Sequence, residues 1–443
     1  MNPEATLVTN DPFPAVTICN MNQVSRRKAS NIHVNSSDYA MLTQICFQDL
    51  NYTAYATAPF HKANDSLVNF MLRNSQPCSE LIAMCIWDQT PITCTDLFRE
   101  VFLDEGICCS FNIAHPFLLY KGEFIMTRDF TSIESQWIPI DWHPETGYPD
   151  DLPVRYYPRK AVGQGVSKGL TLVLNGNIND YYCSSTNGPG FKLQLHNPID
   201  VPQIKETGLL VNLGYQSSFR IATIKDEAQD TLRSVAPKDR QCYFAKEKPL
   251  LYYQYYTRRN CDSECDAMFF LRTCNCIPYF LPKIFDNATI CYIQHLDCQK
   301  KAERVYTDPK TMKCKKECLS SCHDLSYMPD VFETPLATDD FELDNSFMRN
   351  FSKEYISENL ALVNIYFPQN YYRSSIKTPY TGLTEYLSQT GGIMSLMIGF
   401  SVFSLVEFAY FFIIKPLMQL WTKIFRKNIV NIGQVETRRE YEH

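Results

Sequence analysis

The placement of the cysteines constrains this chain more than any other feature of the sequence. The 443 residues include 18 cysteines, an even number, and all lie between Cys19 and Cys322. The last 121 residues contain none. Such crowding is typical of disulfide bonds formed in an oxidising compartment, so we expect this part to fold outside the cell. Five Asn-x-Ser/Thr sequons, about the number that chance supplies, are candidate glycosylation sites: Asn35, Asn51, Asn64, Asn287 and Asn350.

The densest cysteine spacing lies between Cys242 and Cys322. It contains C-x3-C at Cys261 and C-x3-C-x3-C at Cys314, and steps of four place side chains on one helix face. Asn260 has the chemistry of an N-cap, so we expect a helix to start there. Two such faces running antiparallel would be bridged as a ladder, which suggests the pairs Cys242–Cys322, Cys261–Cys318 and Cys265–Cys314. Spacing alone leaves other connectivities open. A zinc site is the less favoured alternative, because the paired C-x2-C spacing is missing, and we expect no structural metal.

A membrane span is predicted near the C-terminus. Gly391 to Ile414 is an apolar run of 24 residues with one charge, Glu407. As a helix it would be ~36 Å long, enough to cross a hydrocarbon core of ~30 Å. We therefore expect residues 388–414 to form a transmembrane helix; a buried core helix is the alternative. Basic residues follow at once, which by the positive-inside rule places 415–443 in the cytoplasm and 1–387 outside.

The first 30 residues contain no apolar run of comparable length, so the sequence shows neither a signal peptide nor a first span. A single C-terminal span would have to draw a large bridged domain across the membrane behind it. We expect that a first transmembrane helix is missing from this chain.

Local patterns elsewhere indicate a mixed α+β fold. We predict strands at 15–19, 170–174, 219–224 and 361–367, and a half-buried strand at 191–195, where apolar and polar residues alternate. The segment 94–102 has helical apolar spacing.

Several segments in order resemble the degenerin/epithelial sodium channel family, most closely its pickpocket-like branch. They are FPAVTICNMN from Phe13, GICCSFN from Gly106, WHPETGYP from Trp142, DYYCSSTNGPGFKLQLHNP from Asp180, CDSECDAMFFLRTCNC from Cys261 and YTGLTEYLSQTGGIMSLMIGFSVFSLVEFAYF from Tyr380.

The resemblance implies a disulfide-rich extracellular domain on transmembrane pore helices. It divides the domain into a finger at about 31–110, palm and β-ball strands at about 12–22, 165–225 and 360–368, and a thumb at about 242–330. It also implies that the three disulfides of the ladder described above belong to the thumb. It further implies the bonds Cys274–Cys298 and Cys276–Cys291, and a bond from Cys19 to Cys108 or Cys109. Partners for five cysteines stay unassigned: Cys46, Cys78, Cys85, Cys94 and Cys183.

The resemblance places a selectivity filter at Gly399-Phe400-Ser401. Glycine permits a break in a helix and frees backbone carbonyls, and a serine hydroxyl adds an oxygen ligand for a cation. The alternative is that Gly391, Ser395 and Gly399, at steps of four, serve close helix packing. Glu407, the lone ionisable side chain of the run, is expected to line a water path. Ser404 and Ser395 are expected to line the pore as well, and Ser388 falls at the family's degenerin position, where gating is affected.

We therefore expect a subunit of a trimeric, amiloride-sensitive channel, selective for sodium or for cations more broadly, in the plasma membrane. It would form homo- or heterotrimers with family subunits in the bilayer, respond to an extracellular stimulus that the resemblance leaves unspecified, pass Na⁺ and need no cofactor. The alternatives are a single-span cysteine-rich receptor or adhesion ectodomain, or a non-conducting truncated subunit.

The sequence contains no cluster of basic residues of the kind that binds nucleic acid. Gly165 to Gly169 matches G-x-S-x-G, but turns precede it and a predicted strand follows it, the reverse of a nucleophile elbow, so we expect no enzyme.

Overall fold

A computed structural model describes residues 5–34, 36–46, 67–121, 137–304, 309–336, 342–379, 382–399 and 401–424. The chain divides into two compact units, Met1–Lys377 and Thr378–His443, which are described in turn.

A five-stranded antiparallel sheet forms one part of the first unit. Its strand order is β13 (Leu209–Val211), β12 (Phe191–His196), β2 (Ala15–Asn20), β7 (Gly106–Phe111) and β6 (Phe98–Leu103). All six residues of both β2 and β12 are buried.

The prediction that the strand at 191–195 is half-buried is therefore wrong. Its polar side chains are buried as well, because each finds a partner. Lys192 pairs with Glu105, Gln194 donates to the Thr207 hydroxyl, and His196 contacts the Thr17 hydroxyl. A buried polar group that is hydrogen-bonded avoids most of the desolvation cost.

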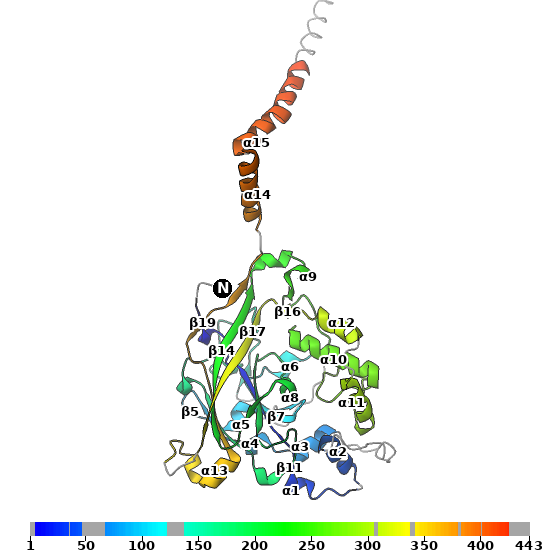
Figure 1. Cartoon of the computed structure of the whole chain (residues 1–443), viewed down its shortest axis with the longest axis vertical. Coiled ribbons are helices and arrows are strands. Elements are labelled where there is room, and N and C mark those ends of the chain that lie inside the picture. Colours follow the sequence, from blue (N-terminus) through cyan, green and yellow to red (C-terminus); the bar gives the residue numbers. More distant parts are fainter. Residues whose placement is uncertain are drawn as a thin grey trace, which may run out of the picture. The chain divides into compact units, whose positions relative to one another are not determined.

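A seven-stranded sheet forms the second part of this unit. Along it lie β17 (Asp324–Pro335), β14 (Tyr215–Ala228), β18 (Leu360–Tyr366), β10 (Leu170–Asn175), β4 (Ile82–Trp87) and β5 (Thr90–Pro91), and β20 (Ser375–Lys377) also pairs with β14. The longest ladder joins β14 and β17 (Figure 1), antiparallel from Tyr215 opposite Pro335 to Asp226 opposite Asp324.

One hydrophobic core contains residues of both sheets. Phe13, two residues before β2, is fully buried. Its ring lies 4.9 Å from Trp87 and 5.6 Å from Phe367, edge to face in both cases, an arrangement that adds to the free energy of burial.

Three helices pack together beside the sheets: α10 (Arg258–Cys274), α11 (Leu296–Arg304) and α12 (Pro309–Glu317) (Figure 1). Helix α10 begins three residues before Cys261 and does not use Asn260 as its N-cap, contrary to the prediction. Thr257 is the N-cap, and its hydroxyl accepts from the Asn260 N–H. The Asn260 side chain instead donates to the carbonyls of Ile199 and Tyr255.

The helix predicted at 94–102 is also wrong beyond its first turn. Only α5 (Cys94–Leu97) is helical, and β6 follows it. The segment becomes a strand because it forms a hairpin with β7, whose turn ends at Gly106 with a φ of +95°. The range assigned to the finger thus also contributes β4 to β7 to the sheets, besides the helices α2 (Ser37–Cys46) and α3 (Leu67–Asn74).

The remaining short elements connect these parts. They are β1 (Thr6–Leu7), β3 (Asn22–Ser25), α1 (Arg26–Ala29), α4 (Cys78–Leu81), α6 (Pro116–Leu119), β8 (Ile138–Pro139), β9 (Tyr156–Tyr157), β11 (Tyr181–Ser184), α8 (Ile204–Thr207), α9 (Pro237–Arg240), β15 (Cys242–Tyr243), β16 (Ser320–Ser321), α13 (Lys353–Asn359) and β19 (Tyr371–Tyr372).

The second unit is helical where it is described. It contains α14 (Leu383–Ile398) and α15 (Val402–Ala409), then a π-helical turn at Tyr410–Ile414 that leads into further α-helix, described as far as Ile424.

Candidate functional site

The apolar C-terminal segment is interrupted at Gly399. Helix α14 ends there because Gly399 adopts a left-handed conformation, with φ +63° and ψ 24°. Its N–H donates to the Met394 and Ser395 carbonyls. A glycine in this conformation is a common helix stop. The last carbonyl groups of a helix have no partner further along that helix, so oxygen atoms are available at this point.

Two serines restart the helix. Ser401 is the N-cap of α15: its hydroxyl accepts from the Ser404 N–H, and the Ser404 hydroxyl accepts from the Ser401 N–H, both at 3.3 Å. This reciprocal pair is a capping box. Gly399 and Ser401 therefore flank a true break in the helix, with serine oxygens beside it. Phe400, the middle residue of the predicted filter, lies outside the described residues.

Glu407 lies on α15, three residues after Ser404, and residues three apart share a helix face. Its side chain is exposed in the single chain. Ser388 and Ser395 both lie on α14, seven residues apart, a spacing that also keeps them on one face. A Cβ added at Gly391, on the same helix, would meet no atom within 4 Å.

The span predicted at 388–414 differs from the structure in two respects. It is divided by the break at 399–401, and the helix long and apolar enough to cross a membrane runs from Val402 to Ile424. None of its most apolar window is buried within the chain. The helix continues beyond Ile414 through a segment that contains several good helix formers: Lys415, Leu417, Met418, Gln419 and Leu420. Pro416 lacks an N–H, and the π-helical turn, where the hydrogen-bond ladder is altered, ends two residues before it.

Nine disulfides account for all 18 cysteines. Five have the pairing proposed for the thumb: Cys242–Cys322, Cys261–Cys318, Cys265–Cys314, Cys274–Cys298 and Cys276–Cys291. The five cysteines without assigned partners form Cys46–Cys183 and Cys85–Cys94, and Cys78 bonds Cys109.

The choice between Cys108 and Cys109 follows from strand geometry. Cys19 on β2 lies directly opposite Cys108 on β7 and bonds it, with 4.4 Å between the Cα atoms. Neighbouring residues of a strand point to opposite faces, so Cys109 points away from Cys19 and bonds Cys78 instead.

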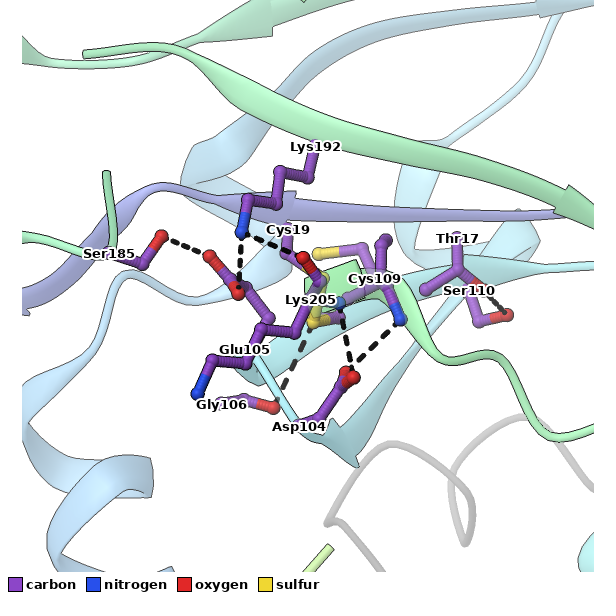
Figure 2. The surroundings of a disulfide bond; sticks show 12 residues. Thr17, Cys19, Asp104, Glu105, Gly106, Cys109, Ser110, Ser185, Lys192 and Lys205 are labelled. Carbon is purple, nitrogen blue, oxygen red and sulfur yellow. Dashed lines mark hydrogen bonds and ion pairs between the residues drawn. A yellow bond between two sulfur atoms is a disulfide. The ribbon is translucent and has the colours of Figure 1, made fainter. Parts of the chain in front are cut away.

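A buried charge network surrounds this bond (Figure 2). The Lys192 ammonium lies 2.9 Å from Glu105, whose carboxylate also accepts from the Ser185 hydroxyl. Beside it, Asp104 accepts from the N–H groups of Ile204 and Lys205, both at 3.1 Å. Burial is the main cause that raises the pKa of Asp104 to about 6.

A second buried carboxyl lies near the N-terminus of α10. Asp200 is 8% exposed, and its Oδ1 has no hydrogen-bond partner among the described residues. Burial, followed by the neighbouring Asp324, raises the pKa of Asp200 to about 6. Nearby His196 is fully buried, and burial lowers its pKa to about 3, so the imidazole is neutral at physiological pH.

Both ends of the first unit are tied to the long strand β14. Near the start of the unit, Asp11 forms an ion pair with Lys225 of β14 at 3.1 Å and accepts a hydrogen bond from the Tyr372 hydroxyl. Near the end of the unit, β20 pairs in parallel with β14, and β19 pairs with β1. The residues just before the second unit are therefore held by the same strand as the residues that open the chain.

The G-x-S-x-G match is not a nucleophile elbow. Val166–Lys168 is a single 3₁₀ turn, and β10 follows it, whereas the elbow needs a strand before the serine and a helix after it.

These features define a membrane protein with a large, disulfide-bridged extracellular domain and an interrupted apolar helix near its C-terminus. A family model described as "Amiloride-sensitive sodium channel" matches residues 2–411, and the chain belongs to this family, whose members are ion channels and not enzymes. Pickpocket protein 28 of Drosophila melanogaster is 32% identical over 421 residues, 93% of this chain and 68% of that protein.

Two further relatives show how widely the similarity extends. Sodium channel protein Nach of Drosophila virilis is 24% identical over 378 residues, 83% of this chain and 82% of that protein. Human acid-sensing ion channel 2 is 24% identical over 417 residues, 89% of this chain and 71% of that protein.

Proposed function

We propose that this chain is a pore-forming subunit of a trimeric, amiloride-sensitive cation channel that passes Na⁺ across the plasma membrane. The observation that carries the proposal is the serine-capped helix break at Gly399 and Ser401, followed on the same apolar helix by Glu407. Membership of a family of sodium channels supports it.

The chemistry of the break suits a small hard cation. Such ions are selected by rings of oxygen ligands that replace part of their water shell. One chain offers the serine hydroxyls and the last carbonyls of α14 at this level. Three chains around an axis would offer three such sets, which is the reason to propose a trimer of this subunit or of related subunits.

Glu407 would attract cations to this path. A carboxylate inside an apolar helix is costly unless it faces water or a partner, and three of them in a ring would concentrate cations. The basic residues Lys415 and Lys423 follow on the same helix, and we propose on the positive-inside rule that the C-terminus is cytoplasmic. The bridged unit then lies outside, where its disulfides are stable.

The test is a current recorded from oocytes that express the chain with an apolar helix of about 20 residues supplied upstream of residue 1. We expect an inward Na⁺ current that amiloride blocks. Replacing Glu407 by Gln should lower the single-channel Na⁺ conductance severalfold, because the neutral amide no longer attracts the ion.

Glu385→Gln is the matched control, since Glu385 lies in the first turn of α14, outside the apolar run. It should leave the conductance near that of the unsubstituted chain. Equal conductance for Glu407→Gln and Glu385→Gln, with both proteins at the cell surface, would remove Glu407 from the pore. Absence of any current would favour a non-conducting ectodomain.

A further inference from the structure

A cavity of about 320 Å³ lies in the extracellular unit, far along the sequence from the pore residues. Tyr120, Tyr252, Tyr253 and Tyr279 line it together with aliphatic side chains, and it is called here the tyrosine chamber. Its volume and its apolar, aromatic lining are typical of small-molecule sites in proteins.

Rigid elements hold the walls in place. One wall comes from β6 and α6, which contribute Leu103 and Leu119, both buried. A second part of the lining is the loop that carries Tyr279 and Leu281. Cys276–Cys291 closes this loop, and the Ile277 N–H donates to the Thr289 carbonyl at 2.9 Å. The cavity is therefore preformed, which lowers the entropic cost of binding.

Two hydrogen-bond donors on the loop are unused. Across the part of the chain that the structure describes, neither the Tyr279 hydroxyl nor the Lys283 ammonium has a hydrogen bond or ion pair, and both residues line the chamber. Burial and the nearby Asp104 and Glu105 keep the pKa of Tyr279 well above its usual value, so its hydroxyl stays a donor.

The carboxylates near these donors are already engaged. Glu100, which lines the chamber, accepts from the Cys78 N–H at 3.1 Å. Glu105 pairs with Lys192 at 2.9 Å, and Asp104 accepts from the backbone of Ile204 and Lys205. The lining of the chamber thus combines apolar side chains with a lysine and a tyrosine whose polar groups have no partner among the described residues.

We propose that the tyrosine chamber binds a small apolar carboxylate, with the hydrocarbon part among the tyrosines and the carboxylate at Lys283 and Tyr279. At ~30 Å³ for each water-sized group, the volume suits a ligand of about ten non-hydrogen atoms. Octanoate has this size and serves as the probe.

The experiment labels the full chain in lipid nanodiscs with a diazirine analogue of octanoate and maps the adducts by peptide mass spectrometry. We expect adducts in the peptides that contain Tyr279 or Tyr252. Octanoate should compete for them, and octylamine, which has the same body and the opposite charge, should not.

Three variants test the assignment. Lys283→Gln should weaken competition by octanoate about tenfold or more, the usual size for the loss of a charge-assisted hydrogen bond. Leu281→Trp should abolish labelling by filling the chamber. Lys246→Gln, an exposed lysine away from the chamber, should change nothing. Disulfide mapping without reduction shows that each variant is folded.

The proposal is overturned if adducts fall only on residues 383–424, the pattern of a molecule dissolved in lipid. It is equally overturned if octylamine competes as well as octanoate, or if folded Lys283→Gln and Leu281→Trp proteins label like the unsubstituted chain. Because binding is read without any current, the result is independent of the proposed channel function.

Discussion

The break between α14 and α15 depends on the backbone conformation of one residue, Gly399. Its φ of +63° lies in the left-handed region, and a Cβ added there would meet no atom within 4 Å. Any cost of a side chain at this position is therefore conformational, ~1–2 kcal/mol. An α-helix that continued through 399 would avoid that cost, so a substitution favours loss of the break.

Gly399→Ala should therefore join α14 to α15 and reduce the Na⁺ current severalfold at equal surface expression. The measurement is whole-cell current divided by surface-biotinylated protein. Gly391→Ala is the control, because Gly391 also has open space around it and lies within α14. If both alanine variants carried the same current, the break would have no role in permeation.

At Asp200 the packing of the surrounding residues, and not the backbone conformation, determines a property of the side chain, namely the pKa of its carboxyl group. Burial raises its pKa to about 6 from an ordinary value of 3.8. The stability that comes from burying the neutral acid is fully present below pH 3.8 and is lost as the pH rises through 6. A shift of this size corresponds to about 3 kcal/mol.

Asp200→Asn should raise the unfolding temperature of the purified chain by a few degrees at pH 7.5 and by only about a third as much at pH 4.5. The asparagine amide is neutral at both pH values, so the substitution removes only the free-energy cost of burying Asp200 in its ionised form. Thermal unfolding followed by tryptophan fluorescence gives the comparison, with the exposed Asp150→Asn as control. An equal effect at both pH values would contradict the assigned cause.

Glu407 stands out in the sequence as the lone ionisable side chain of the apolar run, whereas Gly399 and Ser401 are assigned to a filter only through the resemblance to the family, since the four-residue spacing that includes Gly399 fits close helix packing equally well. The sequence could not identify the buried Lys192–Glu105 pair or Asp200. Lys192 and Glu105 are 87 residues apart, and only the order of strands in the sheet brings them together. The N-cap at Thr257 was missed for a related reason: the side chain of Asn260 is used in tertiary contacts.

At the level of elements, spacing suggested three of the thumb bridges, because a helix repeats its faces every four residues, and the resemblance to the family supplied Cys274–Cys298 and Cys276–Cys291. The other pairs join strands and short helices whose neighbours are set by sheet topology. Cys85–Cys94, for instance, depends on β4 turning back into β5 before α5 begins. The same topology converted the apolar residues at 98–103 into β6, although their spacing also fits a helix.

The nested bridges of the thumb should not contribute independently. Cys242–Cys322 spans 80 residues, but with Cys261–Cys318 intact it closes a loop of only roughly 23. Replacing Cys242 and Cys322 by Ala should cost ~3.4 kcal/mol in the intact chain and ~4.2 kcal/mol when Cys261–Cys318 and Cys265–Cys314 are both absent, because Cys274–Cys298 then leaves a loop of roughly 56 residues. Unfolding midpoints of the four proteins in a double-mutant cycle measure this difference; strict additivity would contradict it.

At the scale of the whole molecule, the α+β class and the extracellular, cysteine-bridged body were both predictable. The cysteine distribution indicates an oxidising compartment outside the cell, and the apolar run indicates a membrane span. Both are consistent with one extracellular domain anchored near its C-terminal end. The extent of the membrane helix was not predictable from hydropathy. The apolar run ends at Ile414, whereas helical structure is described from Val402 as far as Ile424, because backbone hydrogen bonding continues past the end of the apolar run.

An uncovered apolar helix of this length needs a bilayer or other helices around it. Its side chains are highly exposed in the single chain, with Val402 and Phe403 at 81% and 82%. Copies of the chain around a common axis would cover one face and leave the other to lipid. A cation path at the helix break therefore requires that Ser401 faces water and that Val402 does not.

Accessibility of residue 401 tests this requirement most directly. Every native cysteine is in a disulfide, so Ser401→Cys introduces the only free thiol. In oocytes expressing the chain with an upstream helix, a positively charged methanethiosulfonate reagent applied outside should irreversibly reduce the Na⁺ current, and amiloride should slow the reaction. Val402→Cys should be insensitive. An unmodified current at Ser401→Cys, or equal modification at both positions, would contradict a cation path lined at the helix break.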